Sequence, residues 1–111
     1  WRALFTDDFD GTYEGPHPDI QFSSADEMVA MNRKMLAEIG TVHHGHTPEI
    51  DLTGADTATG IWAMVDIVKL GDGFTGYGHY HDEYRKVNGE WKIAKTHLRR
   101  TLVEPGTPRE A

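Results

Sequence analysis

The sequence contains no cysteine, few basic residues and no long apolar run. The absence of cysteine excludes disulfide bonds, thiolate metal ligands and a cysteine nucleophile, and it leaves the redox compartment open. Eleven lysine and arginine residues against 18 aspartate and glutamate residues give a net charge of −7, which argues against nucleic acid and anionic membranes as partners. No apolar stretch approaches the roughly 18 residues that span a membrane, and no secretory signal pattern opens the chain. We therefore expect a cytoplasmic protein without a nucleic-acid or membrane partner.

Two common catalytic signatures are also missing, the Gly-x-Ser-x-Gly nucleophile elbow and a glycine-rich phosphate loop. Histidines are plentiful, and His79 and His81 have the spacing that places two imidazoles on one face of a strand, as metal ligands would be. For a His-x-His metal motif, however, Glu83 follows too closely and Glu90 too late. We therefore expect no metal site and interpret the two residues as a solvent-facing or interface histidine pair.

A helix is the clearest element of the first half of this 111-residue chain. Ser24 and Glu27 form a capping box that marks its beginning, and Gly40 is expected as the residue that follows its end. Apolar side chains recur at helical spacing along one face, which predicts that they pack in the core. These side chains are Met28, Met31, Met35, Leu36 and Ile39.

The remainder of the chain alternates like strands separated by turn residues. Short strands are predicted around Gly11–Gly15 and at 48–52, and longer alternating segments are 57–70, 74–87 and 90–103. Gly71-Asp72-Gly73 and Asn88-Gly89 are hairpin signals, and the polar tail from Glu104 onwards is expected to fray. The predicted fold is α+β in one domain, residues 1–111, with a curved, mostly antiparallel sheet packed on N-terminal helices. Because Trp1–Phe5 resembles a helix end, we expect that a first helix is missing from this chain.

Alternation sorts the strand side chains into two faces, although periodicity alone does not decide which face points inward. Asp66 is unusual because it is a carboxylate in an apolar strand, and if buried it needs a partner. The alternative is that its face lies in solvent or at a subunit contact. Asp66 shares its face of the predicted strand 57–70 with Trp62 and Met64. The faces expected to continue it on the next two strands carry Gly78, Tyr80 and Asp82, and Thr96, Leu98 and Arg100.

The order of these parts resembles the NTF2-like superfamily, and most of all its SnoaL-like branch. The motifs that carry the resemblance are Leu4-Phe5-Thr6-Asp7-Asp8, the capped helix, Thr41-Val42-His43, Gly78-His79-Tyr80-His81-Asp82-Glu83-Tyr84 and Gly89-Glu90-Trp91-Lys92-Ile93. The branch includes the scytalone dehydratase, bile-acid 7α-dehydratase and hexachlorocyclohexane dehydrochlorinase group. The resemblance implies a cone-shaped barrel, often a homodimer, with an apolar pocket for a small hydrophobic ligand and without metal or organic cofactor.

The resemblance also implies residue roles. His43 occupies the place of the general base, and Asp66 is expected to stand in for the aspartate that orients this base from the absent first helix. Tyr80 is expected to polarise a carbonyl or leaving oxygen, and Arg100 to bind an anionic group or developing charge. The expected substrate-binding residues are Tyr13, Trp62, Met64, Gly78, Asp82, Thr96 and Leu98.

These parts suit a cofactor-independent lyase or isomerase, dehydratase-like, because a neutral imidazole in an apolar pocket removes a proton efficiently near neutral pH. The alternative is a non-catalytic NTF2-like module that binds a ligand or mediates dimerisation, since fold alone does not establish activity. The catalytic hypothesis predicts that His43 lies in the largest cavity, hydrogen-bonded to a carboxylate or a tyrosine hydroxyl.

Overall fold

Six strands form one continuous sheet in the computed structural model, which describes residues 1–106. The order across the sheet is β2-β1-β6-β5-β4-β3, and only the β1–β6 pair is parallel. The elements, in chain order, are the 3₁₀ helix η1 (Arg2–Leu4), β1 (Phe5–Tyr13), β2 (Ile20–Phe22), α1 (Ala25–Leu36), β3 (Gly40–Leu52), β4 (Thr57–Lys69), β5 (Phe74–Val87) and β6 (Glu90–Pro105). The predicted α+β fold is thus confirmed, as a mixed, mostly antiparallel sheet.

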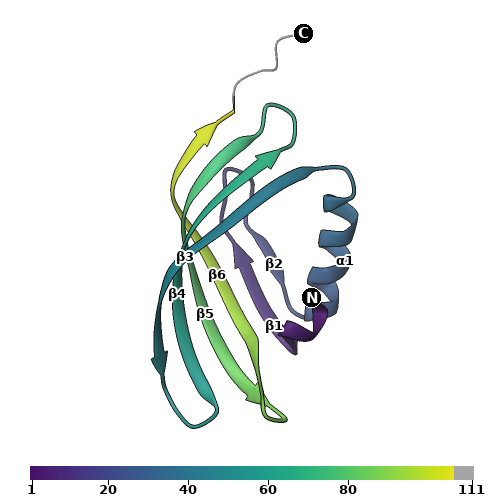
Figure 1. Ribbon diagram of the computed structural model, residues 1–111. Helices are drawn as coiled ribbons and strands as arrows, with labels where there is room; N and C mark the ends of the chain where they lie inside the picture. Colours follow the sequence, from purple (N-terminus) through teal and green to yellow (C-terminus); the bar gives the residue numbers. More distant parts are fainter. Residues whose placement is uncertain (107–111) are drawn as a thin grey trace.

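The meander from β3 to β6 follows the local turn signals. Asn88 and Gly89 both have positive φ angles, 52° and 81°, which a two-residue hairpin of type I′ requires. Gly71 and Gly73 also have positive φ angles in the turn between β4 and β5. Figure 1 shows that the long strands of this meander bend together, so that the sheet has a concave side facing α1.

The hydrophobic core lies at one end of that concave side. α1 packs against β1, β2 and η1, and Ser24 caps its first turn by accepting a hydrogen bond from the Glu27 amide at 3.1 Å. The buried side chains of this core are Phe5, Phe9, Phe22, Ala25 and Met28. Full burial of Phe9 or Met28 contributes about 1.5–3 kcal/mol each. α1 therefore covers the β1 end of the sheet, whereas the concave faces of β3 and β4 extend beyond it (Figure 1).

Two details of the predicted helix are wrong. α1 ends at Leu36, with Ala37 as its C-cap, and Gly40 begins β3 instead of following the helix. Of the apolar side chains expected in the core, Met28 is buried, but Met31, Met35 and Leu36 are 41%, 36% and 46% exposed. The helix packs mainly on β1 and β2, and the buried residues of α1 are Ala25 and Met28, in its first turns.

The ends of the chain also differ from expectation. The segment expected to end a helix contains the short 3₁₀ turn η1, and β1 begins directly after it at Phe5, well before the predicted strand. β2 was not predicted. Glu104 and Pro105 belong to β6 instead of a frayed tail, because this strand pairs with Phe74 and Thr75 of β5. The rest of the predicted tail, 107–111, lies outside the described residues. Within 1–106, no helix has the length and apolarity to cross a membrane.

Candidate functional site

The concave face gathers all eleven residues to which the sequence assigned a catalytic or substrate-binding role. Directly paired residues on neighbouring strands share a face of the sheet, and the registers form three rows across it. One row pairs Trp62 with Tyr80, Leu98 and Tyr13; a second pairs Met64 with Gly78 and Arg100; a third pairs Gly60 with Asp82 and Thr96. His43 lies opposite Asp66 at the β3 edge.

Asp66 and Arg100 form the most buried polar contact of this face. Their side chains are 1% and 8% exposed, and Nη2 of Arg100 donates a hydrogen bond to Oδ2 of Asp66 at 2.5 Å. The guanidinium also donates to the backbone carbonyl of Glu14 and lies 5.3 Å from the ring centroid of Phe74. Asp66 therefore has the partner that a buried carboxylate needs, and that partner is Arg100.

His43 is not held in the way the sequence predicted. It lies inside the edge strand β3, which begins at Gly40 and not at the predicted position 48, and it is solvent-exposed. Within residues 1–106 its ring has no side-chain hydrogen bond, and Oδ2 of the Asp66 carboxylate opposite is bonded to Arg100 instead. The expectation of an enclosed, hydrogen-bonded His43 is therefore wrong. Its position on the same face as Asp66 agrees with the predicted pattern.

A hydrogen-bonded chain connects three side chains at the other end of the concave face. Nε1 of Trp62 donates to the hydroxyl of Tyr84 at 2.8 Å, and this hydroxyl donates to Oδ2 of Asp82 at 2.9 Å. Burial raises the pKa of Asp82, and hydrogen bonds from Thr96 and Tyr84 oppose that rise. Gly60 makes the chain possible, since a Cβ there would lie 2.7 Å from the Tyr84 ring and hydroxyl.

Tyr84 was not among the expected site residues. It lies two residues after Asp82 on the same strand, so alternation alone could have placed it on the concave face. Its value to the site depends on contacts with Trp62, 22 residues away, which a single sequence does not reveal.

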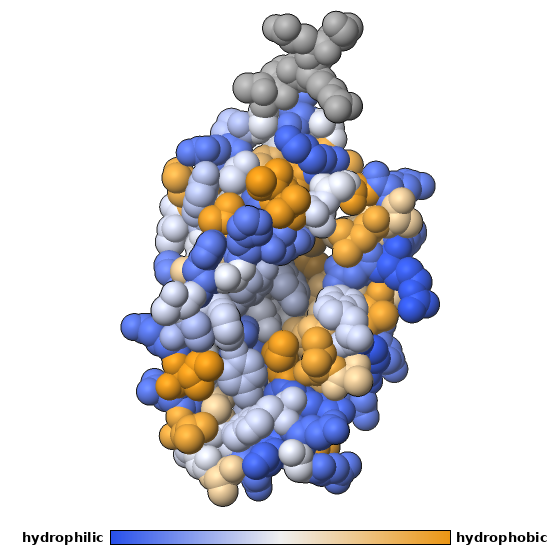
Figure 2. Space-filling model, viewed as in Figure 1, coloured by the Kyte–Doolittle hydropathy of each residue, from blue (hydrophilic) through white to orange (hydrophobic). Residues whose placement is uncertain are grey.

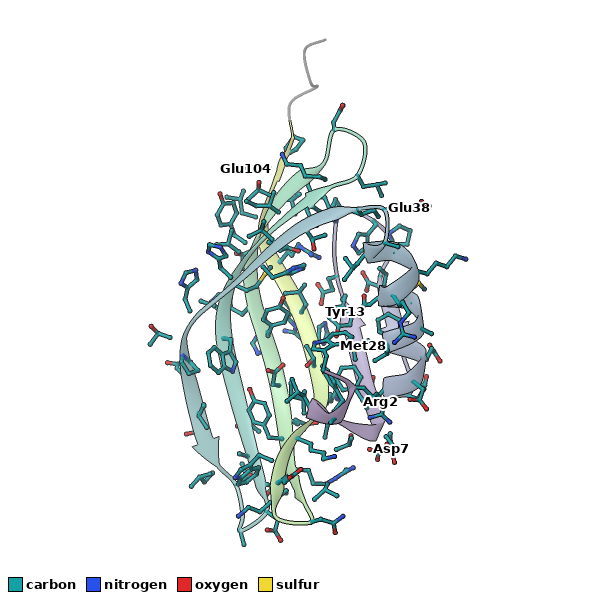
Figure 3. The ribbon with its side chains drawn as sticks, turned by 45° about the vertical axis from the view of Figure 1, so that its right-hand side comes forward. Arg2, Asp7, Tyr13, Met28, Glu38 and Glu104 are labelled. Atoms are coloured by element: carbon teal, nitrogen blue, oxygen red, sulfur yellow. The ribbon has the colours of Figure 1, made fainter. Side chains whose placement is uncertain are left out.

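The other tyrosines of the face remain neutral hydrogen-bonding groups. Burial is the main cause that raises the pKa of Tyr80 to about 12, with the charge of Asp66 adding to it. Burial also raises the pKa of Tyr13, whose hydroxyl lies 3.8 Å from the sulfur of Met28. Figure 3 shows Tyr13 and Met28 together between the sheet and α1. The middle of the concave face is therefore aromatic and apolar, with uncharged hydroxyls.

The space-filling view shows hydrophobic side chains along a recess between the sheet and α1 (Figure 2). Two further hollows, of about 500 and 340 Å³, are lined instead by residues such as Lys95 and His97, and His43 borders neither. His97 lies on the opposite, convex face, where its Nε2 contacts the carboxylate of Glu14.

The remaining histidine pairs also lie on the convex face. His44 and His46 have ring centroids 6.0 Å apart, and the centroids of His79 and His81 are 6.4 Å apart. Within residues 1–106, no three histidine or acidic side chains are arranged to share a metal ion.

Comparison with known proteins identifies the family and supports the fold described above. The model of the SnoaL-like domain matches residues 1–97. The chain belongs to the SnoaL-like family. Its fold also matches that of a provisionally named scytalone dehydratase from Novosphingobium aromaticivorans, with a TM-score of 0.79 and 25% identity over 99% of this chain and 74% of the other.

Two dehydrochlorinases show the same SnoaL-like fold. A type 2 hexachlorocyclohexane dehydrochlorinase has a TM-score of 0.81 and 20% identity, over 96% of this chain and 73% of that one. The type 3 enzyme from Novosphingobium barchaimii has a TM-score of 0.78 and 20% identity, over 94% and 73%. These matches establish the NTF2-like architecture of this family member.

Proposed function

We propose that this SnoaL-like protein is a cofactor-independent lyase or isomerase, dehydratase-like, that acts on a small hydrophobic molecule on the concave face. The observation that carries the proposal is the position of His43 opposite the buried Asp66–Arg100 pair, beside the apolar side chains of Met64 and Trp62. The named activities of two structural neighbours, dehydration and dehydrochlorination, are both eliminations and support the same reaction class.

In this proposal His43 takes a proton from the carbon next to the one that bears the leaving group. The electron pair of the broken C–H bond forms the new double bond, and the leaving group departs with its own bonding pair. A positioned general base of this kind raises the reaction rate by about 10²–10⁴-fold. Tyr80, neutral at physiological pH, donates a hydrogen bond to a substrate oxygen, and the charge of Arg100 favours the anion that develops.

A non-catalytic binding module is the second candidate, and the exposure of His43 favours it. A base that makes no orienting hydrogen bond among the described residues is less well prepared for proton transfer than an oriented one. On this hypothesis the concave face binds an apolar ligand, and replacing His43 leaves the affinity unchanged.

The test uses the substrates that give the neighbours their names. Scytalone and hexachlorocyclohexane are each incubated with the wild type, His43→Asn and His44→Asn, and loss of water or release of chloride is measured. His44 is the matched control, since it is the next residue of the same strand and lies on the convex face. The proposal expects turnover that His43→Asn lowers by about 10²-fold or more and His44→Asn preserves. Binding of both compounds without turnover favours the binding module.

The homodimer and the cytoplasmic location remain proposals. Exposed apolar side chains on the convex face, among them Val42, Ile61 and Leu102, give a second copy a surface to cover. Sedimentation at micromolar concentration that detects only a 12.5 kDa species would contradict the dimer.

A further inference from the structure

His17 has no place in the proposal above, yet its ring lies at the same end of the concave face as Asp66 and Arg100. It belongs to the loop between β1 and β2, residues 14–19. An ideal Cβ on Gly15 would lie 2.5 Å from Nε2 of His17 and 3.0 Å from Nη1 of Arg100. The imidazole therefore occupies the space that a side chain at position 15 would fill, directly beside the guanidinium. Its ring centroid is 6.4 Å from that of Phe74, the ring over which the Arg100 guanidinium also lies.

The hydrogen bond of the ring determines its tautomer. Nδ1 of His17 lies 2.8 Å from the carbonyl oxygen of Pro18. A carbonyl oxygen only accepts hydrogen bonds, so Nδ1 carries the hydrogen and donates it. In the neutral ring the lone pair is then on Nε2, the atom that faces Gly15 and Arg100.

Nε2 is also available to a ligand. His17 is half-buried, and within residues 1–106 this nitrogen has no hydrogen-bond partner and is not among the fully covered polar atoms. A half-buried imidazole with a fixed tautomer and a free lone pair is better prepared for proton transfer than the exposed His43 ring. The Arg100 guanidinium beside it carries a positive charge that favours a negatively charged oxygen or halide nearby.

We propose that His17 is a second proton-transfer residue of this site, with Nε2 as the proton acceptor and Arg100 as the group that stabilises the resulting negative charge. This inference rests on the proposed elimination or isomerisation. For a substrate bound with its C–H bond towards the loop 14–19, Nε2 takes the proton from carbon in place of His43, the C–H electron pair becomes the new double bond, and the leaving group departs with its bonding pair beside the guanidinium. The imidazolium then releases its proton to water. His43 approaches the Asp66–Arg100 pair from the opposite side, the β3 edge.

The experiment compares five proteins with scytalone and hexachlorocyclohexane as probes: the wild type, His17→Gln, His17→Ala, His43→Asn and the matched control Asp19→Asn in the same loop. We expect His17→Gln to lower turnover by about 10²–10⁴-fold and Asp19→Asn to preserve it. We also expect free imidazole to restore part of the activity of His17→Ala, a result that a purely structural role would not produce.

Each other outcome identifies what has failed. Full activity of His17→Gln with loss in His43→Asn overturns the assignment of His17 and leaves the proposed function intact. Absence of turnover in the wild type overturns both the proposed function and the step assigned to His17. The tautomer is tested separately, without substrate, by ¹⁵N NMR of the imidazole; a His17 ring whose Nδ1 lacks the hydrogen overturns the inference whatever the activity.

Discussion

Replacing Arg100 by methionine tests whether the buried ion pair holds the concave face together. The substitution keeps an apolar stem but leaves the carboxylate of Asp66, 1% exposed, without its charged partner. Removing one member of a buried pair costs about 3–5 kcal/mol, because the remaining charge is buried without compensation. The loss of the hydrogen bond from Arg100 to the Glu14 carbonyl adds to this cost, at about 1 kcal/mol.

Urea denaturation followed by tryptophan fluorescence measures this loss. At roughly 4 °C or more per kcal/mol for a chain of this size, the melting temperature should also fall by at least about 12 °C. The double variant Asp66→Leu with Arg100→Met should recover most of the stability, since apolar replacements of a buried pair are often neutral or stabilising. Arg99→Met is the control, because its side chain is 62% exposed on the convex face and its replacement should cost under about 0.5 kcal/mol.

Two results would refute the reasoning. A loss of less than about 1 kcal/mol in Arg100→Met would mean that Asp66 is not buried with a charge. A double variant as unstable as the sum of the single variants would mean that the two residues do not interact.

Three further substitutions test other parts of the fold. Burial raises the pKa of Asp82 above the ordinary 3.8, so the folded state favours the protonated form and ionisation costs stability as the pH rises. Asp82→Asn should therefore stabilise the protein at pH 8, and urea titrations should show this gain shrinking toward pH 4; a gain independent of pH would contradict the burial. Ser24→Ala should cost about 1 kcal/mol of unfolding free energy by thermal melting, since it removes the hydrogen bond to the Glu27 amide, and an unchanged melting temperature would exclude a role for the cap. Gly76→Ala should cost about 1–3 kcal/mol in the same assay, because its Cβ would lie 2.7 Å from Nε of the locked Arg100, and a neutral result would show that the pair can move.

Local signals explain why much of the fold could be predicted from one sequence. The Ser24 cap and the Asn88-Gly89 turn act through their immediate neighbours, so their sequence patterns carry the structure directly. Alternation with period two correctly grouped the members of each face, because successive side chains of a strand always point to opposite sides. Which face is concave depends on where α1 packs, and that contact is remote in sequence.

The errors follow from interactions between distant residues. The parallel pairing of β1 with β6 joins strands from opposite ends of the sequence, and no local sequence pattern predicts it. The partner of Asp66 is Arg100, 34 residues away, and not His43, the residue directly opposite on the neighbouring strand. His17 is a separate case, because its orientation depends on the carbonyl of the next residue, Pro18, and the direction of this backbone atom is set by the loop and not by residue type.

The distance between the two polar ends of the concave face limits what one small molecule can contact. Asp66 and Gly60 are six residues apart on β4, about 20 Å along the strand at 3.3 Å per residue. His43 is paired with Asp66, whereas Asp82 is paired with Gly60, and the apolar row of Trp62 lies between them. A base at the Asp66 end and an acid at Asp82 therefore cannot act on adjacent atoms of one substrate. A second proton-transfer group for the Asp66–Arg100 end must therefore lie at that same end, and His17 is the imidazole beside Arg100. The role left to Asp82 is to position Tyr84 and Trp62 on the concave face.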